Sequence, residues 1–401
     1  MQEDNFIFDP QKTPPNDICH DLLFREGQTA SGEVTYTPRL VCADLKGSLG
    51  RLPQFGDLYD APSKVPKRDS LLWDGELQVQ KEEPKKPNDF QRELEKEEET
   101  GVTADAADSD DQTNYDLDRQ VDVWSDYLRT RFHPRTNVIL EEYQHDNPLK
   151  PFDAFGLGVT TWREDGVGEE IEDKLRSFAE EADNLQGFQV LSDNFDAFGG
   201  LGGSLVELLA DEYSTKSAIS FATSPATYSR HSVQENSARF LNTVLTTAAH
   251  CGGDSTSMSV LTPLSLAADT FVLPGMEPRR FGRLDYSGGS HYHTSAILAT
   301  ALESVTLPWR SSSKKSRMSE VATGISASGR RLAALEMCAP LFGRSTDDNK
   351  YLVDFLKDAD NDGLEMVPIT PGARDSPKEA HVQSVSVCGL DPSRWRPPDF
   401  R

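Results

Sequence analysis

The expected fold is decided by the stretch LQGFQVLSDNFDAFGGLGGS, residues 185–204. Its apolar run from Phe188 to Leu191 has the length and composition of a buried strand. Four closely spaced glycines follow, and SLVELLADEY then predicts a helix from Leu205 to Tyr213. A strand, a glycine-rich loop and a helix in this order are typical of a phosphate-binding turn in an α/β protein.

Strands and helices alternate on both sides of this stretch. Strands are expected at NVILEEY (137–143) and SAISFA (217–222), and VWSDYLRTRF (123–132) looks helical. In EEIEDKLRSFAEEADNL (169–185), apolar residues recur at the 3.6-residue spacing of a helix. This alternation predicts the α/β class, with a doubly wound, Rossmann-type sheet.

Composition divides the chain into four expected segments. Residues 1–78 contain short apolar pieces between turn residues, with a strand expected at 40–43. Residues 79–120 are acidic and poor in aliphatic side chains, so we expect a disordered insertion or linker, with an interaction motif as the alternative. Residues 121–310 form the α/β domain, and residues 311–401 are a less periodic α+β region.

Net charge and cysteine usage exclude several classes of function. The 401-residue chain carries a formal net charge of −25, which argues against binding nucleic acid or anionic lipid directly. The five cysteines are widely spaced and form no C-x-x-C motif, so reduced thiols facing the cytosol are expected. No apolar run approaches the roughly 18 residues of a membrane span, and the N-terminus is acidic rather than signal-like.

The glycine-rich stretch is the main candidate for a binding site. Backbone N–H groups of glycines can approach a phosphate closely, and a serine there can cap the helix or donate to the phosphate. Against this, Leu201 crowds the loop, and Asp193 and Asp196 repel an anion unless Mg²⁺ lies between them. Two interpretations stay open, a phosphate site and a stable loop without ligand. The candidate residues are Gly199, Gly200, Gly202, Gly203 and Ser204.

Other motifs give no catalytic residue and no metal site. DADNDG (358–363) resembles the opening of a calcium loop, but Ile369 stands where a bidentate glutamate is needed, so a surface turn is expected. His291 and His293 lack a third ligand and are expected to face the same side of a strand. SSSKKSR (311–317) is a basic loop, with a docking site for an acidic partner as the alternative.

Several of these pieces resemble the tubulin superfamily. LQGFQV followed by FGGLGGS is similar to its strand and glycine box, RFHPRTNV (131–138) to its F-H-P segment, and FLNTVLTT (240–247) to a Y-N-S-I-L-T-T helix. The more specific resemblance is to the misato family of divergent tubulin-like proteins. It is carried by TYTPRLVCADLKGSLG (35–50), VWSDYLRTRFHPR (123–135) and HTSAILATALESVTLPWR (293–310).

The resemblance implies a tubulin-like fold with a smaller, partly incomplete second domain. Asn242 falls on the guanine-reading asparagine of the superfamily, so a degenerate site for GTP and Mg²⁺ is one expectation and an ordinary helix-face asparagine is the other. No match is found for the acidic residue that acts in GTP hydrolysis, so we expect no GTPase activity and no bound cofactor. The first strand and part of the C-terminus of the family also have no counterpart, and we expect an incomplete gene model or a splice form of low solubility.

The misato resemblance further implies a non-catalytic factor in mitochondrial distribution, morphology and partitioning and in mitochondrial DNA inheritance. Its expected location is the cytosolic face of the outer mitochondrial membrane and the cytoplasm. Expected partners are proteins at that surface, tubulin or the cytosolic chaperonin, without direct contact to nucleic acid. The alternatives are a GTP-binding switch or GTPase of the tubulin superfamily and a spindle or microtubule-associated factor.

Overall fold

The computed structural model of the chain describes residues 18–28, 32, 34–54, 86–100, 117–164, 166–227, 232–252, 259–267, 278–281, 284–311, 316–326, 329, 331–340, 364–371 and 382. The calcium-like turn at 358–363 and the two lysines of the basic stretch at 311–317 lie outside the described residues. The chain forms two compact units from interleaved segments. Unit 1 contains residues 20–151 and 166–183, and unit 2 contains residues 152–165 and 184–401.

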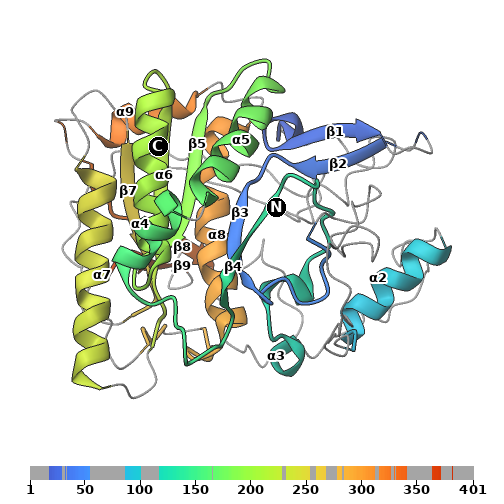
Figure 1. Cartoon of the computed structure of the whole chain (residues 1–401), viewed down its shortest axis with the longest axis horizontal. Helices are drawn as coiled ribbons and strands as arrows, with labels where there is room; N and C mark the ends of the chain where they lie inside the picture. The colour runs from blue at the N-terminus through green and yellow to red at the C-terminus, as the bar shows by residue number, and fades with distance from the viewer. Residues whose placement is uncertain are drawn as a thin grey trace, which may run out of the picture. The chain divides into compact units, whose positions relative to one another are not determined.

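The described residues of unit 1 form two small sheets. Strands β1 and β2 pair antiparallel, and β3 and β4 pair parallel (Figure 1). The predicted strand at 137–143 is confirmed as β4, and the strand expected at 40–43 lies slightly later as β3. The elements of unit 1 are η1 (His20–Leu22), β1 (Phe24–Gln28), β2 (Val34–Pro38), β3 (Cys42–Lys46), α2 (Asp89–Thr100), α3 (Leu117–Gln120), η4 (Trp124–Tyr127), β4 (Asn137–Gln144) and α5 (Val167–Glu180).

Helix α5 packs on β4, as its apolar periodicity predicts. Ile171 and Phe178 lie on its buried side, and Val138 and Leu140 are buried on β4. The Lys174 ammonium donates to the carbonyl oxygen of Asn137 at 2.6 Å, which ties the helix to the start of the strand. The helix therefore combines apolar burial with one directed polar contact.

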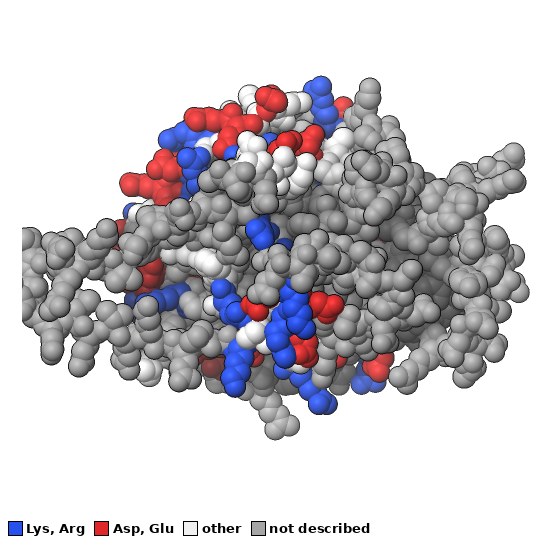
Figure 2. Space-filling view, turned by 90° about the vertical axis from the view of Figure 1, so that its right-hand side faces the viewer, with Lys and Arg blue, Asp and Glu red and all other residues white. Residues whose placement is uncertain are grey.

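Helix α2 corrects part of the prediction for residues 79–120, because it lies within the segment expected to be disordered. The Gln91 backbone N–H donates to the Asn88 side chain at 2.7 Å, and the Asn88 N–H donates to the Gln91 side chain at 3.2 Å. This reciprocal pair is a capping box, which satisfies N–H groups that a helix otherwise leaves open. Arg51 and Glu95 of α2 form an ion pair at 2.8 Å. On the face that Figure 2 shows, Lys and Arg side chains of the described residues are intermixed with Asp and Glu.

The helix expected at 123–132 is also corrected. Only the short turn η4 forms there, because side chains compete for the local backbone. The Asp126 carboxylate accepts from the backbone N–H groups of Asp122 and Val123 at 2.8 and 3.0 Å, and Ser125 Oγ donates to the Leu49 carbonyl at 2.8 Å. These contacts hold the start of the turn, and the chain becomes extended at Leu128.

Unit 2 is built on a three-stranded parallel sheet of order β5-β6-β7. Helices α4, α6 and α7 lie together in front of this sheet in Figure 1, whereas α9 packs on β6 and β7. The α/β class with a parallel sheet is therefore confirmed. The elements of unit 2 are α4 (Phe155–Glu164), β5 (Gly187–Asp193), α6 (Phe198–Glu212), β6 (Ser217–Thr223), α7 (Val233–Cys251), β7 (Ser259–Leu264), α8 (His291–Arg310), α9 (Met318–Ile325), β8 (Glu336–Pro340) and β9 (Leu364–Pro368).

The main hydrophobic core of unit 2 lies on the side of the sheet covered by α8 and α9. Ile219 and Phe221 of β6 pack there with Trp309 of α8 and Met318 of α9. Antiparallel strands β8 and β9 close the same core, to which Val367 contributes a buried side chain. Burial of apolar side chains is the main favourable contribution to the stability of a domain.

The two histidines expected on a strand instead begin helix α8, which corrects that prediction. Ser290 Oγ accepts the backbone N–H of His293 at 3.3 Å and acts as the N-cap. A serine before a helical pattern is a helix-start signal, and α8 then extends over 20 residues to Arg310.

The boundaries of the compact units differ from the four segments expected from composition. Spatial contact assigns residues 166–183 to unit 1 and residues 152–165 to unit 2, although both lie inside the predicted α/β domain. The four segments were defined by amino-acid composition, whereas the two units are defined by spatial contact. Because the two criteria differ, the predicted segments stay a prediction. Among the described residues, no helix has the length and apolar content needed to cross a membrane.

Candidate functional site

The candidate site residues all lie on α6 and α7, two adjacent helices of unit 2. The four glycines belong to the first two turns of α6 rather than to a loop, because the helix begins at Phe198 and not at the predicted Leu205. Ser204 is not a cap. Its hydroxyl donates to the carbonyl oxygen of Gly200 at 3.1 Å, one turn back in the same helix.

An acidic side chain already occupies the N-terminus of α6. The Asp196 carboxylate accepts the backbone N–H of Phe198 at 2.9 Å. The N–H groups of Gly200 and Leu201 both donate to the carbonyl oxygen of Ala197, at 3.0 and 3.1 Å. A negative charge at this end stabilises the helix dipole, and the N–H groups of Phe198, Gly200 and Leu201 are satisfied by the chain itself.

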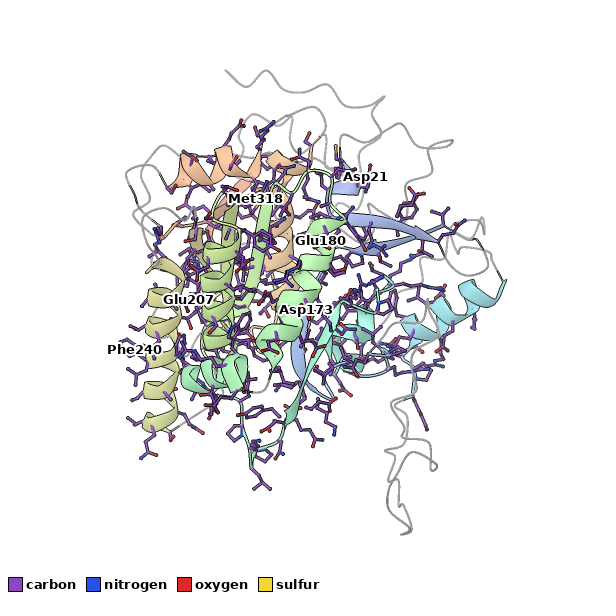
Figure 3. All side chains as sticks on the ribbon, turned by 45° about the horizontal axis from the view of Figure 1, so that its top comes forward. Asp21, Asp173, Glu180, Glu207, Phe240 and Met318 are labelled. Carbon is purple, nitrogen blue, oxygen red and sulfur yellow. The ribbon has the colours of Figure 1, made fainter. Side chains whose placement is uncertain are left out.

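On the side facing α7, two glycines allow close helix packing. A Cβ at Gly199 would overlap the Thr246 hydroxyl, and a Cβ at Gly203 would lie 2.8 Å from the Ala249 Cβ. Both separations are shorter than a side chain tolerates, so alanine at either position would force α6 and α7 apart. Figure 3 shows the two helices side by side, with Glu207 labelled on α6 and Phe240 on α7.

The other two glycines serve the remaining faces of α6. A Cβ at Gly200 would overlap the Phe155 carbonyl oxygen of α4. Gly158 of α4 packs equally closely on α6, because a Cβ there would lie 2.6 Å from the Leu201 nitrogen. A Cβ at Gly202 would lie 2.9 Å from the Ser192 hydroxyl of β5. All four glycines are therefore required for packing, whether or not a ligand binds.

These residues do not fit a nucleotide phosphate in the way that the family resemblance implies. The glycines are buried against neighbouring elements, and the Asp196 carboxylate lies where a phosphate would need the positive end of the helix. A second anion there would meet that carboxylate at short range.

Asn242 has a clear structural role in α7. Its side chain is almost fully buried, and its oxygen accepts the N–H of Phe155 at 2.9 Å. Its amide nitrogen donates to the carbonyl oxygens of Asp153 and Phe195, at 2.7 and 2.8 Å. The amide thus fastens the segment before α4 to the segment before α6, and its two N–H groups are both used within the chain.

His250, which sequence reasoning did not single out, is buried on the same side of α7. Its side chain is 1% exposed, and neither ring nitrogen has a hydrogen-bond partner among the described residues. Burial lowers the pKa of His250 from its ordinary value of 6.5 to about 4. The ring is therefore neutral at pH 7.

The buried imidazole predicts an acid-sensitive fold. The unfolded chain takes up a proton on His250 near pH 6.5 and the folded chain only near pH 4, so the free energy of unfolding falls as the pH drops between these values. We expect His250 to lower the free energy of unfolding by about 2 kcal/mol at pH 5 relative to pH 7. Urea unfolding at both pH values measures it.

The control for this prediction is His250→Leu, which keeps an apolar side chain of similar size. The pKa of His133 in unit 1 is also lowered to about 4, mainly by burial, so wild-type data alone do not isolate one histidine. The variant should lose part of the stability difference between pH 7 and pH 5. An unchanged difference would assign the acid sensitivity elsewhere.

Among the residues that the structure describes, no group of three or more His, Cys, Asp or Glu side chains is placed to hold a metal ion. The thiol of Cys42 is buried beside Asp44, and its pKa is raised to about 12 by burial first and by that carboxylate second. A thiol with so high a pKa is a poor nucleophile at neutral pH.

Comparisons with known proteins identify the same families that the sequence motifs resemble. Residues 116–311 match the tubulin domain family, and residues 1–96 match the family described as the misato segment II tubulin-like domain. The mouse protein named Protein misato homolog 1 is 37% identical over 337 residues, which cover 81% of this chain and 58% of the mouse protein.

More distant relatives align over nearly all of the chain. The human protein misato homolog 1 is 34% identical over 404 residues, covering 95% of this chain and 67% of the human protein. Protein misato of Drosophila melanogaster is 30% identical over 401 residues, covering 94% of this chain and 67% of the fly protein. This chain thus spans between 58% and 67% of the length of these relatives. The chain belongs to the misato family of tubulin-like proteins.

Proposed function

We infer that this chain is a non-catalytic tubulin-like factor that acts in mitochondrial distribution, morphology and partitioning and in the inheritance of mitochondrial DNA. Its proposed location is the cytosolic face of mitochondria and the cytoplasm, where it binds other proteins and no nucleotide. Membership of the misato family supports the cellular role. The observation that supports the non-catalytic part is the glycine-rich start of α6, whose glycines are taken up by packing against α4, α7 and β5.

The net charge gives further support to a protein-binding role. A chain with a formal charge of −25 repels nucleic acid phosphates, so an effect on mitochondrial DNA inheritance would pass through other proteins. Candidate partners are proteins of the mitochondrial surface, tubulin and the cytosolic chaperonin.

Thermal unfolding of the purified protein with and without millimolar GTP and Mg²⁺ tests the non-catalytic role. Nucleotide at about 100 times its dissociation constant would add roughly 2.7 kcal/mol to the stability. We expect the midpoint to stay unchanged with GTP, as with ATP. The variant Asp196→Ser keeps a capping oxygen and removes the charge. A GTP shift confined to this variant would identify the carboxylate as the group that excludes phosphate.

Two other outcomes favour the alternative functions. A GTP-specific shift in the unaltered protein contradicts the proposal and supports a GTP-binding switch or GTPase. In cells depleted of the protein, the proposal expects fragmented or clustered mitochondria, and re-expression of the protein should restore their normal shape. Normal mitochondria together with a defective mitotic spindle would instead support the microtubule-associated alternative, which rests on the tubulin-like fold alone.

A further inference from the structure

The buried side of helix α7 carries a polar row, defined as Asn242, Thr246 and His250. These residues follow each other at intervals of four, so their side chains lie on one face of the helix. The Asn242 amide donates to the Phe195 carbonyl oxygen at 2.8 Å. The Thr246 hydroxyl donates to the Asn194 carbonyl oxygen at 3.4 Å. The first two residues of the row therefore bond to successive residues of the segment that follows β5.

His250, the third residue of the row, lies close to the Ser192 side chain of β5. A Cβ at Gly202 of α6 would lie 2.9 Å from Ser192 Oγ and 3.3 Å from His250 Nε2, so both atoms approach one point on α6. Both atoms are buried, and neither has a hydrogen-bond partner among the described residues. They therefore lie near each other without a direct hydrogen bond between them.

Two buried polar atoms in this position need a common partner. Nearly all buried polar groups in folded proteins are hydrogen-bonded, either within the chain or to an ordered water, because an unpaired group keeps its full cost of desolvation. Buried waters typically make about three hydrogen bonds to groups that the chain itself leaves unpaired. A water that bridges two such groups binds them nearly as well as a direct contact would.

We propose that one buried water molecule joins the Ser192 hydroxyl to Nε2 of His250 and so completes the third contact between α7 and the chain around the end of β5. A water molecule both donates and accepts, as the serine hydroxyl does, so it serves either tautomer of a neutral imidazole. A metal ion is a poorer occupant, because the described part of the chain places no three His, Cys, Asp or Glu side chains to hold one. The inference is independent of the proposed mitochondrial role.

A crystal structure of the wild-type protein, at a resolution where other buried waters are visible, tests the proposal directly. We expect one density peak that lies about 2.7 to 3.2 Å from both Ser192 Oγ and His250 Nε2. The peak should be as well ordered as the side chains around it, because the site is closed on all sides by buried atoms of α6, α7 and β5.

A double-mutant cycle in urea at pH 7, where the ring is neutral, tests the same contact in solution. Ser192→Ala should lower the unfolding midpoint of the wild type, because the water loses one of its partners. In the His250→Leu background the same substitution should lower the midpoint by no more than about half as much. The matched control is Ser265→Ala, another buried serine of unit 2, whose hydroxyl donates to the Pro225 carbonyl oxygen at 3.3 Å. Its effect should be equal in both backgrounds.

Three results would overturn the proposal. A direct hydrogen bond between Ser192 and His250 in the crystal would leave no place for the water. Empty density between the two atoms, in a map that shows other buried waters, would leave the third contact unmade. Equal effects of Ser192→Ala in the two backgrounds would show that the hydroxyl and the ring share no partner.

Discussion

Gly158→Ala is expected to lower the free energy of unfolding by about 3 kcal/mol, whereas Gly156→Ala in the same helix is expected to raise it by about 0.5 to 1 kcal/mol. A Cβ at Gly158 would overlap the Ala197 carbonyl oxygen and lie 2.6 Å from the Leu201 nitrogen. Both atoms belong to the backbone of the α6 start, which cannot rotate away as a side chain can. Gly156 has nothing within 4 Å of its added Cβ, so alanine there only improves helix propensity.

Chemical denaturation of the two variants beside the wild type measures both effects. Their opposite signs matter, because a general sensitivity of α4 to substitution would make both variants less stable. If Gly158→Ala were as stable as Gly156→Ala, the close approach of α4 to α6 would not be needed for stability. The glycine-rich start of α6 would then lack its packing explanation, and the nucleotide interpretation would regain support.

Asn242→Asp is expected to cost about 3 to 5 kcal/mol of stability in the absence of any ligand. The substitution keeps the shape of the side chain but places a carboxylate oxygen where the amide nitrogen donates to Asp153 and Phe195, at 2.7 and 2.8 Å. Two carbonyl oxygens would then face a buried negative charge with no donor between them. The comparison is Asn236→Asp, which is exposed in the first turns of α7 and should be neutral or slightly stabilising.

Thermal unfolding without nucleotide distinguishes the two roles expected for Asn242. A guanine-reading asparagine contributes to ligand binding, so its replacement by aspartate would leave the melting midpoint of the ligand-free protein close to the wild-type value. A fastening asparagine contributes to the fold itself, so the midpoint should drop by several degrees. A drop no larger than that of Asn236→Asp would argue against the fastening role.

Periodic patterns predicted the elements whose burial is one-sided or complete. β4, β6 and α5 lie where apolar spacing placed them, with side chains buried on one side or along the whole element. β5 also lies at the predicted position, but the expectation of a buried strand was wrong there, because only Val190 is buried in it and Leu191 is 61% exposed. The helix predicted at 123–132 and the strand predicted at the start of α8 were wrong, because single polar side chains determine the secondary structure there. Asp126 holds the first segment in a short turn, and Ser290 starts the second as a helix.

The candidate site shows a different limit of sequence reasoning. A ligand contact and a close packing contact require the same residue types, so the sequence alone does not decide between these two roles for the α6 glycines and Asn242. The deciding information was the partner of each residue. It comes from α7 for Gly199 and Gly203, from β5 for Gly202, and from α4 with the segment before it for Gly200 and Asn242. A sequence signal for that partner exists in FGLG (155–158), where two glycines open a helix, although glycine is otherwise unfavourable in helices.

The parallel order β5-β6-β7 also sets how this unit must fold. Gly187 pairs with Ser217 and Ala218 pairs with Ser259, so each pairing closes a loop that contains a whole helix. Contacts of such long sequence separation slow folding, because the entropy of closing the loop is lost before the strands gain their hydrogen bonds. Until β7 is added, the backbone edge of β6 is unpaired, and until α8 and α9 are added its buried apolar side chains Ile219 and Phe221 are open to other chains. The order of synthesis then matters, since β5 leaves the ribosome well before the strand that completes the sheet.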